Sequence, residues 1–136
     1  MSDMANPYSA YKKQSVVTMT PVEVVIRLYS EIERQLAIAV SAVEETPDIA
    51  KANNAFIKAQ DCIDALREAL DMSIPIANNL EQLYVFFYNE IVKANIHKEC
   101  STVKKIIPMV AELRDAFTQI SQMTKEEIEA QAKANK

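Results

Sequence analysis

Apolar residues recur every three or four positions through four stretches of the chain, and this spacing predicts four amphipathic helices. We expect them over residues 21–44, about 47–71, from 75 or 78 to about 95, and about 101–122. Each stretch carries a seam of apolar residues. The seams are Val22, Val25, Tyr29, Ile32, Leu36, Ala39 and Val43; Ile49, Ala52, Phe56, Ala59, Ile63, Leu66 and Leu70; Ala77, Leu80, Tyr84, Phe87, Ile91 and Ala94; and Val103, Ile106, Val110, Leu113, Phe117 and Ile120. Side chains with this spacing share one face of a helix, so the seams predict a common core.

The start of the first helix has a clear local signal. Thr20 can serve as its N-cap, and Pro21 occupies the first helical position, where its missing N–H costs nothing. Glu23 can complete a capping box. Thr46 and Pro47 repeat this arrangement before the second helix. Both helices are therefore predicted to begin at a proline.

The third helix has two candidate starts, at Pro75 or at Asn78, because an asparagine can also cap a helix. Pro108 lies inside the periodic pattern of the fourth helix. A proline there removes one hydrogen bond and clashes with the preceding turn. We therefore expect the fourth helix to bend or to start late.

Short connections force neighbouring helices to run antiparallel. The chain has no Gly, and 49% of its 136 residues are hydrophobic, which is typical of long helices rather than of tight hairpins. The predicted fold class is all-α, an antiparallel up-down-up-down four-helix bundle over residues 20–122. We expect an irregular, flexible apolar leader over 1–19, and a short helix or a disordered tail over 123–136.

The charge balance excludes several classes of partner. A net charge of −4 does not suit a nucleic-acid groove or an anionic membrane surface, which bind through Lys and Arg. No apolar run reaches the roughly 18 residues of a membrane-spanning helix, and no signal peptide is recognisable. We therefore expect no membrane insertion and a cytoplasmic location. Cys62 and Cys100 lack the spacing of a metal or redox motif and are expected to remain thiols.

No residue pattern typical of catalysis is recognisable in the sequence. Helical bundles hold di-metal sites through Glu-x-x-His motifs, but the single histidine, His97, has Ala94 three residues before it. One histidine in a polar turn makes no catalytic triad without a nucleophile beside it. A chain without glycine has no glycine-rich phosphate loop. The sequence predicts no catalytic residue, no metal and no cofactor, and hence a protein that is not an enzyme.

The segment NPYSAYKKQSVVTMTP, running into VEVVIRLYSEIERQL, resembles the FliS family of flagellar secretion chaperones. The resemblance continues through KAQDCIDALREAL, LEQLYVFFYNEIVKAN and VAELRDAF, and so covers most of residues 6–120. The chain departs from the family at Phe117, where the family usually has Trp, and at MSIPIANNL, where many members have a Gly pair. Neither departure removes a polar functional group, so they bear on local packing and on the turn rather than on the role.

The resemblance implies a cytosolic export chaperone. Such a protein binds the disordered C-terminal segment of flagellin, one to one, in hydrophobic surface grooves and prevents premature polymerisation. It delivers the client to the flagellar type III export apparatus and contacts a component of the export gate when loaded. The alternative is a non-enzymatic helical adaptor or regulatory protein that binds a folded partner or a second copy of itself.

The resemblance also implies client-binding roles for seven residues. They are Tyr8, Tyr11, Leu28, Ile57, Cys62, Tyr84 and Tyr88. A modest rotation of a helix would exchange Tyr29 or Phe87 with these positions. The leader, with its two tyrosines, is interpreted either as a lid over a client groove or as a frayed terminus.

Two of these positions have an alternative structural interpretation. Leu28 either faces the client or packs against a neighbouring helix. Cys62 belongs to a row of small residues that either forms a shallow groove for a client helix or accepts another helix of the bundle. That row consists of Ala55, Cys62, Ala65 and Ala69.

Overall fold

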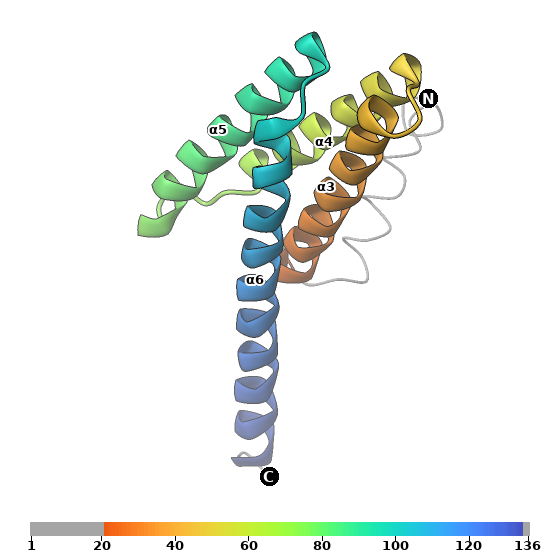
Figure 1. Cartoon of the computed structure of the whole chain (residues 1–136). Helices are drawn as coiled ribbons and strands as arrows, with labels where there is room; N and C mark the ends of the chain where they lie inside the picture. The colour runs from red at the N-terminus through yellow and green to blue at the C-terminus, as the bar shows by residue number, and fades with distance from the viewer. Residues whose placement is uncertain (1–20, 135–136) are drawn as a thin grey trace, which may run out of the picture.

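The computed structural model describes the backbone of residues 21–134, and their side chains except those at 124, 125, 128 and 131. The predicted leader therefore lies outside the described residues. The described range contains four α-helices and no strand (Figure 1): α3 (Pro21–Glu44), α4 (Ile49–Glu68), α5 (Pro75–His97) and α6 (Ser101–Ala134). No helix in this range is both long and apolar enough to cross a membrane. The predicted all-α class is confirmed.

The helices pack in chain order around one core. α3 packs against α4 and α6, while α5 packs mainly against α4 and to a smaller extent against α6. Within the described range, the backbones of α3 and α5 make no mutual contact, so these two helices are diagonal partners across the bundle. Figure 1 shows that α5 and α6 separate after the turn that joins them and that the C-terminal half of α6 continues past the start of α3, with no other described helix beside it. The chain therefore folds as the predicted bundle, with one open side.

The predicted seams form most of the core. The buried residues that pack together include Tyr29, Ile32, Leu36 and Ala39 of α3; Ala52, Phe56, Ala59, Ile63 and Leu66 of α4; Leu80, Tyr84, Phe87, Ile91 and Ala94 of α5; and Val103, Ile106 and Val110 of α6. The prediction for Ile49 is wrong, because it is the first residue of α4 and its side chain is 69% exposed. Along α6, Leu113 and Phe117 are only partly buried and Ile120 is 47% exposed.

The ends of α4 and α5 differ in detail from the prediction. α4 begins at Ile49 rather than at Pro47, because the carboxylate of Asp48 accepts a hydrogen bond from the backbone N–H of Lys51 (3.1 Å) and caps the helix. It ends at Glu68, before the expected Asp71. α5 begins at Pro75, which decides between its two candidate starts.

The last helix is longer than predicted. α6 begins at Ser101, so the alternative of a late start is wrong, and it continues through the exposed Pro108 to Ala134. No separate tail helix follows position 122. The sequence from Gln122 to Ala134 has no Gly or Pro and consists mainly of good helix formers, so nothing stops the helix there. At about 1.5 Å per residue α6 spans about 51 Å, whereas α5 spans about 35 Å.

Candidate functional site

Two ion pairs identify the side of α6 that faces α3. Arg114 Nη1 lies 2.7 Å from Glu33 Oε2, and Lys104 Nζ lies 2.5 Å from Glu44 Oε1. Met109 lies midway between Arg114 and Lys104 in the sequence, about 140° around the helix from each. Met109 therefore lies on the flank of α6 that is turned away from α3.

A third ion pair orients α5. Both Nε and Nη2 of Arg67 on α4 donate to Glu81 Oε1, at 3.0 and 2.7 Å. Glu81 thus marks the flank of α5 that faces α4. Leu83 and Phe86 are about 140° or more around the helix from Glu81, so they lie on the flank that faces away from α4, toward α6.

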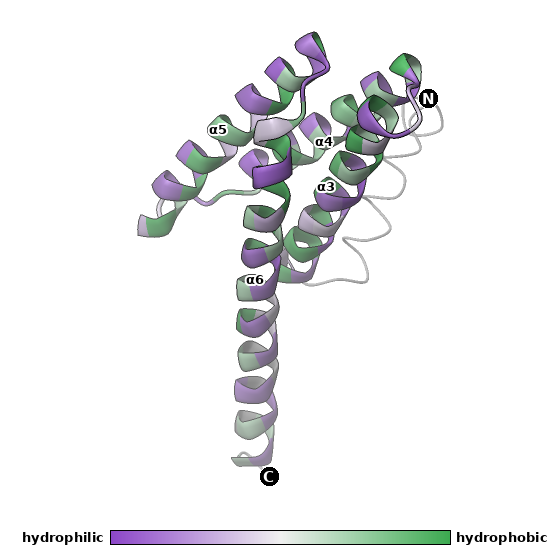
Figure 2. Ribbon diagram, in the orientation of Figure 1, coloured by the Kyte–Doolittle hydropathy of each residue, from purple (hydrophilic) through white to green (hydrophobic). Residues whose placement is uncertain are grey.

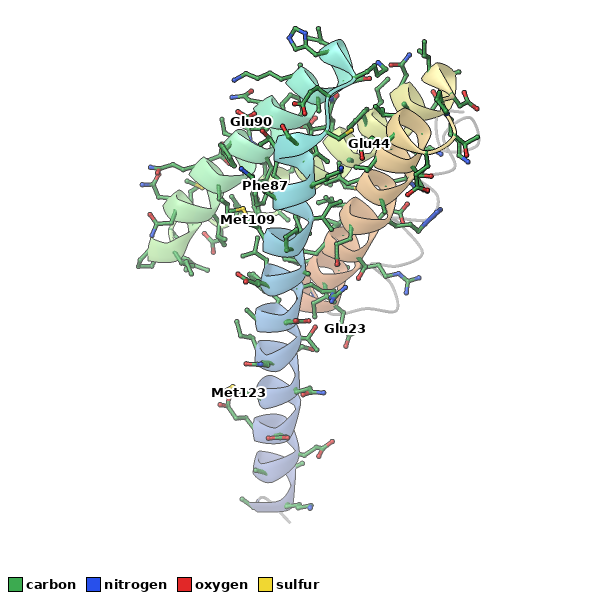
Figure 3. All side chains as sticks on the ribbon, viewed as in Figure 1. Glu23, Glu44, Phe87, Glu90, Met109 and Met123 are labelled. Atoms are coloured by element: carbon green, nitrogen blue, oxygen red, sulfur yellow. The ribbon has the colours of Figure 1, made fainter. Side chains whose placement is uncertain are left out.

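Large apolar side chains line these two flanks. We call them the α5–α6 face, which comprises Leu83 and Phe86 of α5 and Met109, Leu113, Phe117, Ile120 and Met123 of α6. Phe86 is 42%, Met109 37% and Met123 59% exposed. Figure 3 shows Met109 and Met123 on the same side of α6. Figure 2 shows that apolar residues recur along α6 beyond the part that packs against α3.

The face stays open because its two helices have other main partners. α5 is held to α4, and α6 is held to α3 by two ion pairs. Single exposed apolar residues are common, but a continuous set at helical spacing marks an interaction surface. Met109, Leu113, Ala116, Ile120 and Met123 alternate steps of four and three, which is the spacing that receives another helix. The face is thus suited to bind an amphipathic segment.

The end of the face near the α5–α6 turn is polar. Glu90, Lys93, Ala94, His97, Glu99 and Thr102 line a hollow of about 320 Å³ there. The side chain and backbone N–H of Ser101 hold the pKa of Glu99 below its usual range. Among the described residues, no group of His, Cys, Asp or Glu side chains is placed to hold a metal ion. The α5–α6 face is therefore an apolar surface for binding that ends at a polar hollow near the α5–α6 turn.

The seven predicted client-binding residues are not brought together. Cys62 and Tyr84 are buried in the core and form no part of the outer surface. Leu28 and Tyr88 are partly buried against the core, and Ile57 is 47% exposed on α4. Tyr8 and Tyr11 lie outside the described residues.

The row of small residues on α4 is mostly buried inside the bundle. Ala55, Cys62 and Ala65 are buried, and α4 packs against α3 and α5. The interpretation that another helix packs on this row is therefore the one that the structure supports for these three residues, while Ala69 is exposed. Helix propensity and spacing alone could not decide this, because both interpretations need small residues.

The sequence contained a signal for the face, which the prediction applied to Tyr84 and Tyr88 rather than to Phe86. Phe86 belongs to a run of four aromatics within five residues, which cannot all point into one core. Leu113, Phe117 and Ile120 were assigned to the core seam, but Leu113 and Phe117 are only partly buried and Ile120 is 47% exposed. Met109 and Met123 were not singled out.

Comparison with known proteins gives consistent results. The family model described as "Flagellar protein FliS" matches residues 4–124. The flagellar secretion chaperone FliS of Bacillus subtilis (strain 168) is 32% identical over 117 residues, which cover 86% of this chain and 87% of that protein. The flagellar secretion chaperone FliS of Vibrio cholerae serotype O1 is 31% identical over 123 residues, covering 86% and 90%.

Proposed function

The chain belongs to the FliS family of flagellar proteins, and we propose that it is a cytoplasmic secretion chaperone whose client is flagellin. It binds the disordered C-terminal segment of flagellin in a one-to-one complex and prevents premature polymerisation. It then delivers the client to the flagellar type III export apparatus, where the loaded chaperone contacts a component of the export gate.

The observation that carries this proposal is the open α5–α6 face. The strip from Met109 to Met123 is about 21 Å long, enough for about four turns of a client helix. A disordered segment that folds on such a face covers its own apolar residues and those of the chaperone together. Ordering the segment costs free energy, so the complex stays reversible and the client remains able to unfold for export.

Other surface positions extend the proposed contact. Ile57 on α4 is exposed, and Leu28 on α3 and Tyr88 on α5 are partly exposed. A flagellin segment that continues beyond the α5–α6 face reaches these residues by passing around the bundle. We therefore retain these three as secondary client contacts.

The direct test uses purified flagellin from the same organism, intact and without its C-terminal segment. Intact flagellin should form a one-to-one complex by size-exclusion chromatography with light scattering, and its polymerisation should be suppressed. The truncated flagellin should not bind. A chain that self-associates and ignores intact flagellin would contradict the proposal and favour the helical adaptor.

A matched pair of variants locates the contact. Phe86→Ser removes an aromatic group from the α5–α6 face and should weaken flagellin binding about five- to tenfold, as expected for losing the burial of part of a large apolar side chain. Ile49→Ser removes a more exposed apolar group at the start of α4, outside the proposed contacts, and should leave the affinity unchanged. Equal losses in both variants would mean that the client does not use this face.

A further inference from the structure

Two tyrosines meet in the middle of the bundle. The hydroxyl groups of Tyr29 on α3 and Tyr84 on α5 are hydrogen-bonded to each other, and both side chains are buried. These helices are diagonal partners, and their backbones make no contact within the described range. The two side chains therefore bridge the centre of the bundle through their tips.

A third ring connects this bridge to the client-binding surface. The ring of Phe117 on α6 lies 5.6 Å from that of Tyr29, tilted by 45°, and the rings of Tyr29 and Tyr84 are 6.4 Å apart. Phe117 is only partly buried and belongs to the α5–α6 face. The rings thus form a continuous chain from α5 through α3 to α6, and α5 and α6 themselves have little direct backbone contact.

The hydrogen bond between the two tyrosines fixes the position of their rings, for a physical reason. A hydroxyl in an apolar core must have a partner, because an unsatisfied polar group there loses its hydration without compensation. Neither tyrosine can turn or slide without breaking the bond, so the bond fixes the Tyr29 ring on which Phe117 packs. Burial raises the pKa of both hydroxyl groups, so both stay protonated and the bond persists at neutral pH.

We propose that Tyr29 and Tyr84 are positioning residues for the α5–α6 face, and that their hydroxyl pair sets the place of Phe117 and hence the shape that the client meets. The part of this proposal that concerns affinity rests on the proposed function. The part that concerns the position of Phe117 does not.

The chain has no tryptophan, so Phe117→Trp provides a single indole reporter on the face. In this background, Tyr84→Phe and Tyr29→Phe each remove one hydroxyl and keep the ring. We expect the indole emission to move to longer wavelength and acrylamide quenching to increase. Tyr88→Phe is the matched control, because it removes a hydroxyl one turn further along α5 that takes no part in the bridge, and it should leave the emission unchanged.

The double variant Tyr29→Phe/Tyr84→Phe separates positioning from stability. Replacing both partners of a buried hydrogen bond by apolar groups of the same shape is nearly neutral for folding, whereas each single variant leaves one hydroxyl unsatisfied. We expect the double variant to recover thermal stability but to keep the altered indole emission. Flagellin affinity, measured without the indole, should fall roughly three- to tenfold in the single and double variants.

Three results would overturn the proposal. The first is an indole emission that does not respond to loss of either hydroxyl. The second is a double variant that recovers both stability and the original emission, which assigns the pair a structural role only. The third is an equal response to Tyr88→Phe. Should Phe117→Trp fail to fold, hydrogen exchange of the backbone amides around Phe117 in the tyrosine variants gives the same comparison. Since the emission needs no flagellin, its outcome is independent of whether flagellin is the client.

Discussion

The two sides of the bundle have the same spacing of apolar residues, but one side is closed by helix packing and the other stays open. On the α3–α4 side the buried residues include many small ones, and the two helices share the most extensive contact in the bundle. These small residues are Ala39, Ala42, Ala52, Ala55 and Ala59. On the α5–α6 side the residues are large, the contact is limited, and Phe86 and Met109 stay partly exposed. Small side chains let two backbones approach and close an interface, whereas large ones without a partner leave a surface for another molecule.

The largest expected effect on stability distinguishes a buried aromatic residue from an exposed one. Phe56 on α4 is fully buried, so Phe56→Ala should lower the free energy of unfolding by about 3–5 kcal/mol. Phe86→Ala, on the open side, should lower it by less than about 1 kcal/mol, because much of that side chain is already in water. Urea unfolding followed by circular dichroism measures both. Equal losses would show that the α5–α6 side is closed in solution.

The tyrosine bridge should make stability depend on alkaline pH. Burial raises the pKa of Tyr29 and Tyr84 in the folded protein, and for Tyr29 the bond from Tyr84 adds to the rise. The unfolded chain releases these protons above about pH 10, and the folded protein releases them at higher pH. Stability from this pair is therefore fully present below pH 10 and decreases above it, by at most about 1.4 kcal/mol per pH unit for each tyrosine.

The comparison for this pH dependence is Tyr29→Phe/Tyr84→Phe. Its unfolding free energy should decline less steeply between pH 9.5 and 11 than that of the unaltered chain. Tyr88→Phe controls for the loss of a tyrosine hydroxyl that takes no part in the bridge. Parallel curves for the unaltered chain and the double variant would contradict burial of the two hydroxyls.

Lys98, in the turn between α5 and α6, connects the open side of the bundle to α4 on the closed side. Lys98 has a positive φ of 51°, and its Nζ donates to Asn53 Oδ1 of α4 (2.7 Å) and to Asn95 Oδ1 (2.8 Å). A chain without glycine uses a lysine where a helix commonly ends in Gly. Lys98→Gly should therefore be more stable than Lys98→Ala by roughly 1 kcal/mol, since both lose the amine but only glycine adopts this φ without cost. Thermal unfolding of the two variants gives the difference, and an advantage for alanine would be inconsistent with this backbone geometry.

The smallest expected effect concerns the attachment of α6 to α3. Arg114→Gln removes the ion pair with Glu33 and should cost about 0.5 kcal/mol at low salt, less at high salt. The variant tests whether the two contacts of α3 are independent, because α6 should loosen from α3 while the α3–α4 contact is unaffected. Hydrogen exchange should increase in α6 and not in α4. A uniform increase across both helices would show that the ion pair supports the whole bundle.

The spacing of apolar residues was enough to predict the helices and most of the core. All six predicted seam residues of α5, for example, are buried, and α3 has the predicted limits. The extent of α6 was missed because no residue near position 122 stops a helix, and the run of helix formers continues to Ala134.

The candidate site was less predictable for a different reason. Tyr84 lies in the seam and also in the aromatic run, and periodicity does not reveal that its hydroxyl finds Tyr29 in the core rather than water. Cys62 lies in a row of small residues whose partner is decided by which helices come close. The openness of the α5–α6 side depends on how two helices diverge from one turn, which is a property of the assembled bundle rather than of any local segment.

Oxidation of methionines by peroxide, followed by mass spectrometry, tests the central claim directly. Met109 and Met123 lie on the α5–α6 face, and Met72, in the α4–α5 connection, is 59% exposed like Met123. Exposed methionine thioethers convert to sulfoxides, and a bound protein segment shields them. Saturating flagellin should slow the oxidation of Met109 and Met123 and leave that of Met72 unchanged. Protection of Met72 with continued oxidation of Met109 would contradict binding at the α5–α6 face.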